Sequence, residues 1–154
     1  MSVAVLVCAS GAPAIANTAN GPLPIALAVQ KGCEFTVGRM DFGQVGLFTP
    51  TIDQTTPLSV RCTANVPFTL SLDGGQSFAS NTRQMKRLTG FFPPALPYTL
   101  FKDAGRTTLW APGDTVAGNS GSTGTVNLQI YGRVTGLTLT LGTYSDTVVV
   151  TFSF

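Results

Sequence analysis

The sequence contains no histidine, which removes His-based catalytic triads and the commonest protein ligand of zinc. Charged side chains are also scarce, at 10% of the residues, and they give a net charge of +2. No run of Lys and Arg occurs, so nucleic acid is not an expected partner. No apolar stretch reaches the ~18 residues that a membrane-spanning helix needs, so no integral membrane segment is expected in the mature chain.

What remains is a chain rich in apolar and small polar residues. Its 154 residues fit one domain with a short extension. Apolar residues make up 44% of the chain, which is enough for a large core. Because charge is scarce, the surface must depend on Thr, Ser, Asn, Gln and Gly for solubility, as is typical of extracellular β-proteins.

Residues 1–16 are predicted to be an export signal. Val3 to Ala9 form a short apolar run, and Ala14-Ile15-Ala16 is a small-x-small cleavage site that leaves Asn17 as the first mature residue. No Lys or Arg precedes the apolar run, so either translation starts upstream or the sequence is truncated. The alternatives are a buried N-terminal strand and, with a poorer match, a lipoprotein signal at Cys8.

Apolar and polar residues alternate with a period of two in several segments, and helical periodicity is hard to find. Each alternating segment predicts a strand with one face on a core and the other in solvent. The apolar sets are Cys33, Phe35 and Val37; Leu58, Val60 and Cys62; Phe68, Leu70 and Leu72; Val126, Leu128 and Ile130; and Val148, Val150, Phe152 and Phe154. Gly-, Pro- and Asp-rich turns separate them, which predicts an all-β sandwich or barrel.

The cysteines agree with export. Cys8 would leave with the signal, so that Cys33 and Cys62 remain as a pair. In an oxidising compartment this pair predicts one disulfide, which would sit inside the sandwich and join the first strand to the second. The alternative is two free buried thiols.

Two further segments are predicted from local composition. Residues 107–110 are expected to form a short strand whose Trp110 packs at the edge of the core rather than binding a ligand. Residues 89–97 contain three prolines and are expected to form an exposed loop rather than a central strand. Its Phe91 and Phe92 are either a contact patch or fold back onto the sandwich.

Residues 17–30 are the most informative part of the chain. After a polar start, the apolar side chains fall on one face of an extended segment, at Leu23, Ile25, Leu27 and Val29. Pro24 argues against a central place in a regular sheet. A free apolar strand is an aggregation hazard unless it inserts into a groove, so the pattern favours strand addition. The alternative is an ordinary first strand of the same domain.

The C-terminal segment supports insertion. The sequence stops at Phe154, directly after an apolar strand over 148–154. If this strand lies at an edge, the missing neighbour leaves an apolar cleft that another chain must fill.

A series of short motifs runs through most of the chain. In order they are Gly32-Cys33, Phe42-Gly43, Leu58-x-Val60-x-Cys62-Thr63, Phe68-Thr69-Leu70-Ser71-Leu72-Asp73-x-Gly75, Arg83-x-Met85, Tyr98-x-Leu100-Phe101-x-Asp103, Thr107-x-x-Trp110, Tyr131-Gly132-Arg133-Val134 and Gly142-x-Tyr144-x-Asp146-x-Val148-x-Val150-x-Phe152. In this order and spacing, residues 31–154 resemble the spore coat protein U family, which includes subunits of archaic chaperone–usher pili.

The resemblance implies an incomplete immunoglobulin-like β-sandwich that lacks its last strand. It implies that a periplasmic chaperone lends a strand first, and that an outer-membrane usher then lets the next subunit's extension replace it. The donor side chains would be Leu23, Ile25, Leu27 and Val29, and the acceptor groove would be bordered by Val148, Val150, Phe152 and Phe154. Cys33 and Cys62 match the family disulfide. Such a subunit is secreted through the periplasm to a pilus on the cell surface, where it supports adhesion and biofilm formation.

Two departures from the family pattern concern loops. Ala111-Pro112-Gly113 follows Trp110, where the family usually has Gly directly after Trp. The Phe91-Phe92-Pro93-Pro94 loop is longer than usual. These differences affect expected surface contacts rather than the expected fold.

Other functions fit the sequence less well. An enzyme is not expected, because no nucleophile elbow, phosphate-binding loop or metal-ligand spacing occurs, and no cofactor is implied. A tip adhesin or binding module could use the loops at 91–97 or 117–124, but the donor-like segment favours a shaft subunit. A coat protein of a dormant cell, assembled in a similar way, is the third possibility.

Overall fold

The computed structural model describes residues 24–44, 46, 51–88, 95–135 and 141–154. The predicted signal, Leu23, Phe91 and Phe92 lie outside these residues. Within them the chain forms nine β-strands: β1 (Cys33–Val37), β2 (Thr51–Cys62), β3 (Pro67–Leu72), β4 (Arg83–Arg87), β5 (Ala95–Phe101), β6 (Thr115–Asn119), β7 (Thr125–Thr135), β8 (Tyr144–Ser145) and β9 (Val150–Ser153). The predicted all-β class is therefore confirmed. The described ranges hold no helix that could cross a membrane.

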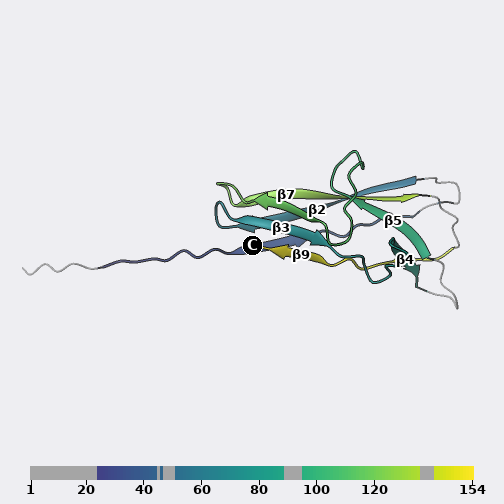
Figure 1. Cartoon of the computed structure of the whole chain (residues 1–154), viewed down its shortest axis with the longest axis horizontal. Coiled ribbons are helices and arrows are strands. Elements are labelled where there is room, and N and C mark those ends of the chain that lie inside the picture. Colours follow the sequence, from purple (N-terminus) through teal and green to yellow (C-terminus); the bar gives the residue numbers. More distant parts are fainter. Residues whose placement is uncertain (1–23, 45, 47–50, 89–94, 136–140) are drawn as a thin grey trace, which may run out of the picture.

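The strands form two antiparallel sheets. The larger has the order β1-β2-β7-β5-β4-β8, and the smaller has the order β6-β3-β9. The centre of the larger sheet is the β2–β7 ladder, in which eleven residue pairs run from Thr51–Thr135 to Arg61–Thr125. Figure 1 shows the small sheet packed over one end of the large one. The other strands of the larger sheet pair outward from the two sides of this ladder.

The core lies between the sheets and follows the predicted alternation. Every second residue of β2, β3 and β7 points inward, because successive strand residues face opposite sides. The buried apolar side chains are Leu58, Val60, Phe68, Leu70, Leu72, Tyr98, Leu100, Trp110, Ile130 and Val134. The inward faces predicted for β2 and β3 are confirmed, with Val60 and Leu70 fully buried.

The predicted disulfide is present and joins neighbouring strands. Cys33 and Cys62 are direct partners in the β1–β2 register, with their Cα atoms 4.0 Å apart. Both residues are half-buried and Cys62 packs against the core cluster, so the bridge lies at the margin of the core and not fully inside the sandwich as expected. Since the paired strands belong to one sheet, the bridge ties an edge strand to its neighbour and does not cross the core.

Replacing both cysteines with serine should destabilise the domain by about 3–4 kcal/mol, because the bond closes a loop across 29 positions. In addition to this global loss, β1 should open locally, because its only described strand partner is β2. Urea denaturation would measure the loss of stability, and hydrogen exchange would locate it. Equal loss of protection in β1 and in the β2–β7 ladder would contradict this local role.

Three local predictions need correction. Residues 107–110 form no strand, because Asp103 accepts the amides of Thr107 and Thr108 and folds the segment as a turn with a single bridge at Leu109. Pro97 lies inside β5, at a point where the strand is paired with β4 but not yet with β7. Ala117 to Asn119 belong to β6 and not to a loop.

Trp110 itself packs as predicted. Its side chain is 3% exposed and belongs to the core cluster. The indole N–H donates to the carbonyl of Asp114 at 2.9 Å, so its polar atom is satisfied. The ring therefore has a structural role in the sandwich.

Candidate functional site

Two strands border an unfilled gap between the sheets. β1 ends the larger sheet and β9 ends the smaller one, and each pairs along one side only among the described strands. Their other sides present backbone N–H and C=O groups without a ladder partner. Unpaired edges of this kind are the usual place for another strand to add.

Aromatic rings close one end of the gap. The ring of Phe152 on β9 lies 5.3 Å from that of Phe35 on β1, centroid to centroid. It also lies 5.5 Å from Phe68 and 5.4 Å from Phe154. Phe154 is nevertheless 60% exposed, so this cluster is open to solvent at its rim.

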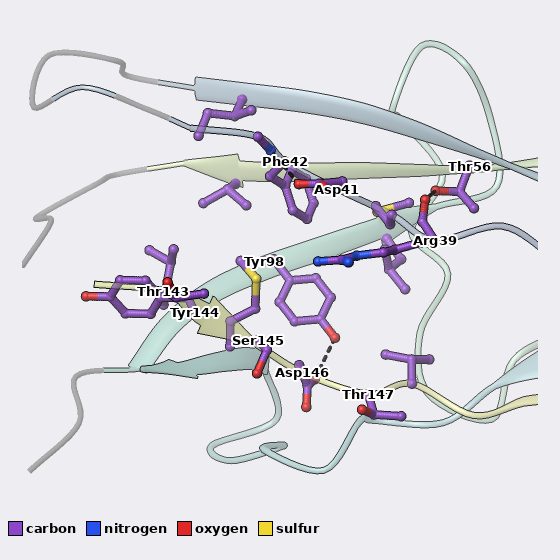
Figure 2. A pocket seen from close by; sticks show the side chains of 18 of the residues that line it. Arg39, Asp41, Phe42, Thr56, Tyr98, Thr143, Tyr144, Ser145, Asp146 and Thr147 are labelled. Atoms are coloured by element: carbon purple, nitrogen blue, oxygen red, sulfur yellow. Dashed lines mark hydrogen bonds between the residues drawn. The ribbon is translucent and has the colours of Figure 1, made fainter. Parts of the chain in front are cut away.

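Beyond the aromatic cluster the gap widens into a groove of about 980 Å³. One wall is formed by residues 37–44, which continue from β1, and the other by residues 141–148 and Val150. Figure 2 shows Arg39, Asp41 and Phe42 on one side, Thr143 to Thr147 on the other, and Tyr98 between them.

The floor of the groove is the hydrophobic core itself. Leu72, Leu100 and Ile130 are almost fully buried, yet they also line the groove. Met85 and Leu96 are only partly buried and extend this apolar floor along β4 and β5. A core that opens to solvent over such a volume lacks packing contacts that a further strand could supply.

The C-terminal wall exists because the chain changes sheets. β8 pairs with β4 in the large sheet, whereas β9 pairs with β3 in the small one. Between them, the amide of Gln76 donates to the carbonyl of Thr147 at 3.1 Å. The amide of Val149 donates to the Asp73 carboxylate at 2.9 Å. These bonds fix the crossing segment along one side of the groove.

Asp146 anchors the middle of this crossing. Its carboxylate accepts the Tyr98 hydroxyl at 2.7 Å and the amide of Ser77 at 3.1 Å. Burial, and then the bond to Asp146, raise the pKa of the Tyr98 phenol well above its usual value of 10.0. The wall is therefore tied to β5 by a protonated tyrosine.

This bond predicts a pH dependence. The folded state holds the Tyr98 proton more tightly than the unfolded state does, so stability falls as pH rises above about 10. Tyr98→Phe removes the titrating group, and we expect a weaker alkaline loss than in the parent chain. Urea denaturation at several pH values between about 8 and 11 measures this. Parallel loss of stability in the two chains would contradict the assignment.

The other wall is held to β2. The amide of Gly38 donates to the carbonyl of Pro57 at 2.9 Å, and the hydroxyl of Thr56 donates to the carbonyl of Arg39 at 3.3 Å. Further along, Met40 and Phe42 occupy the space over Gly132 that a side chain there would fill. The wall thus has a defined position although it forms no strand.

The structure places the predicted groove residues in two groups. Val148 and Val150 line the groove. Phe152 and Phe154 lie in the aromatic cluster at its end. The strand predicted over 148–154 is shorter than expected, because regular pairing with β3 covers only Val150–Ser153.

The inward face predicted for β1 is only partly covered. Phe35 is 36% exposed although its ring packs against Phe152 of β9, and Val37 is 45% exposed. The walls at 38–44 and the Tyr98–Asp146 contact were not predicted as parts of a site. The Gly-x-Tyr-x-Asp motif at 142–146 was the only available signal for the latter.

The three predicted donor residues that the structure describes lie away from the groove. Ile25, Leu27 and Val29 are 88%, 89% and 77% exposed, and none belongs to a strand. Figure 1 shows this extension leaving β1 and running away from the sandwich. The domain in this structure therefore does not cover the apolar face of its own extension.

The described residues offer no cluster of three or more His, Cys, Asp or Glu side chains that could hold a metal ion. Two carboxylates line the described part of the groove, those of Asp41 and Asp146. The carboxylate of Asp146 already accepts a hydrogen bond from Tyr98 within the wall. What the geometry can do is accept an extended, apolar segment between two strand edges.

Comparisons with known proteins give the following matches. The family model described as the Spore Coat Protein U domain matches residues 19–151. No curated protein matches the sequence. A chain in the structure of the CsuC-CsuE chaperone-tip adhesion subunit pre-assembly complex, from archaic chaperone-usher Csu pili of Acinetobacter baumannii, is 24% identical with a TM-score of 0.59.

That match covers 82% of this chain but only 40% of the other, so this chain spans less than half of its length. A chain from a structure described as a chaperone-tip adhesin complex of CFA/I fimbriae biogenesis is 16% identical over 77% of this chain and 41% of that one, with a TM-score of 0.49. The first match confirms the predicted immunoglobulin-like sandwich.

Proposed function

The chain belongs to the spore coat protein U domain family, and we propose that it is a structural subunit of an archaic chaperone–usher pilus. One combination of features carries the proposal. The domain leaves its core open along a groove between two strand edges, while an extension with an exposed apolar face leaves the same domain. The open groove and the exposed extension each leave apolar surface in water. Insertion of one subunit's extension into the groove of another would bury both surfaces.

Burial supplies the driving force. Leu23, Ile25, Leu27 and Val29 would each contribute about 1.5–3 kcal/mol on burial, or on the order of 6–12 kcal/mol together before ordering costs. The inserted strand would also pair with the free edges of β1 and β9. Because it completes a core and is not merely added to a surface, the resulting joint should be very slow to dissociate.

The expected partners follow from the need to cover the open core before and during assembly. An open core must be protected before assembly, so we propose that a periplasmic chaperone first occupies the groove and that an outer-membrane usher directs its exchange for the extension of the next subunit. The Cys33–Cys62 bond suits an oxidising compartment on this route. The end product would be a fibre on the cell surface, with roles in adhesion and biofilm formation and no enzymatic activity.

A shaft position is favoured over a tip position. The present chain pairs one described domain with an exposed extension, which suits a subunit that both accepts and donates a strand. A coat protein assembled in the same way would share this geometry.

The test is to export the chain and compare boiled with unboiled samples by SDS gel electrophoresis. The unboiled parent should give a ladder of SDS-resistant multimers that collapses to a monomer on boiling. A chain with Leu23→Ser, Ile25→Ser, Leu27→Ser and Val29→Ser, termed the serine-extension chain, should give only monomers. A matched control carries Ala26→Ser and Ala28→Ser on the opposite face and should keep the ladder.

A soluble, folded monomer in all three samples would overturn the proposal, since the domain would then be complete by itself. A ladder that persists in the serine-extension chain would show that another surface joins the subunits.

A further inference from the structure

Arg39 places a positive charge in an otherwise mostly apolar groove. Among the described residues that line the groove it is the sole Lys or Arg. Its backbone is fixed, because its carbonyl accepts the Thr56 hydroxyl. Figure 2 shows its guanidinium pointing from the wall into the groove.

The guanidinium has no hydrogen bond or ion pair with any other described residue. The two aspartates of the groove do not neutralise it. Asp41 accepts the amide of Gly43 at 2.9 Å and lies outside ion-pair distance of Arg39. Asp146 is held by Tyr98 and Ser77. Within the described part of the chain, its five N–H donors therefore have no protein partner.

Arg39 is exposed in the open groove, and a strand inserted along this wall would take part of its guanidinium out of water. Removing a guanidinium from water is costly unless a partner replaces the lost hydration. A carboxylate is the best partner, because it accepts two parallel N–H bonds from the planar guanidinium. An inserted strand with an acidic side chain at this level would therefore fit the groove better than a wholly neutral one.

The chain's own extension cannot supply such a partner. Residues 17–32 contain no Asp or Glu, and Lys31 adds a charge of the wrong sign. Insertion of the extension into the groove of an identical subunit would leave Arg39 partly covered and without a carboxylate.

We propose that the preferred occupant of this groove is a donated strand from a different protein, which brings an acidic side chain to Arg39. The inference rests on the proposed function and deepens it, because it makes the subunit part of a mixed fibre. Arg39 then determines specificity, since it disfavours copies of the same chain relative to an acidic partner.

The test uses synthetic peptides and the serine-extension chain, whose own extension cannot compete. The parent peptide covers residues 17–32. Four further peptides carry one Glu in place of Leu23, Ile25, Leu27 or Val29, and each has a twin with Gln at the same position. Because Glu and Gln are matched in size, their comparison isolates the charge from the lost apolar contact. Binding is followed by fluorescence anisotropy.

At the position that faces Arg39, we expect the Glu peptide to bind at least about tenfold more tightly than its Gln twin. Arg39→Gln should abolish this preference. Lys86→Gln is the matched control, because it makes the same charge change on an exposed residue of β4 that does not line the groove. It should keep the preference.

Two results would overturn the inference. If the parent peptide binds but no Glu peptide exceeds its Gln twin, or if the preference survives Arg39→Gln, the acidic partner is wrong while strand donation stands. If no peptide binds at all, strand donation fails as well, and the inference falls with it.

Discussion

A peptide of residues 17–32, added at about 100 times its Kd, should raise the melting temperature of the serine-extension chain by about 10 °C. Saturation at this level stabilises the folded state by about 2.7 kcal/mol. For a domain of this size each kcal/mol corresponds to about 3–4 °C. The physical reason is that the peptide fills a groove of about 980 Å³ whose floor is the core.

The matched control is the same peptide with serine at positions 23, 25, 27 and 29, which should leave the melting temperature unchanged. Differential scanning fluorimetry over a range of peptide concentrations gives both the shift and its saturation. Equal shifts with both peptides would mean that the backbone edge, and not the apolar face, is recognised. No shift with either would contradict strand acceptance.

Arg83→Met should cost about 3–5 kcal/mol of folding stability, the largest single-residue effect that we expect outside the apolar core. Arg83 is 4% exposed, and burial lowers the pKa of its guanidinium. The group donates to the carbonyl of Asp73 at 2.7 and 3.0 Å and to that of Trp110 at 2.6 Å. Methionine fills part of the space but leaves both carbonyls without these donors.

Urea denaturation measures the loss, and Lys86→Met is the control because Lys86 is exposed on the same strand. The control should change stability by less than about 0.5 kcal/mol. A cost below about 1 kcal/mol for Arg83→Met would show that water replaces the guanidinium at little expense. Because Asp73 also holds the C-terminal wall, the variant should loosen the groove as well.

The central strands could be predicted because their signal is local. Alternation in β2, β3 and β7 identifies an inward face directly, and Leu58, Leu70 and Ile130 are buried as that pattern requires. β4 gave no such signal, because its sequence, Arg83-Gln84-Met85-Lys86-Arg87, is mostly charged and polar and is typical of an exposed segment. Its buried arginine is satisfied by carbonyls from two distant loops, which no local pattern contains.

The groove could be predicted only in outline. An apolar C-terminal strand suggested an open edge, and Val148 and Val150 do line the groove. The opposite wall depends on the bonds that Gly38 and Arg39 make to β2, which no local sequence pattern predicts. The crossing at Asp146 depends on Tyr98 and Ser77, 48 and 69 positions away along the chain. Such contacts arise from tertiary structure.

The position of the disulfide has a mechanical consequence. If a neighbouring subunit holds the extension, tension on the fibre reaches this domain through residues 24–32 and first meets a strand at Cys33. The covalent bond passes that load at once to Cys62, at the end of β2. From there it is borne in shear by the eleven-pair ladder between β2 and β7. The short β1, which would otherwise peel away from an open edge, carries little of the force.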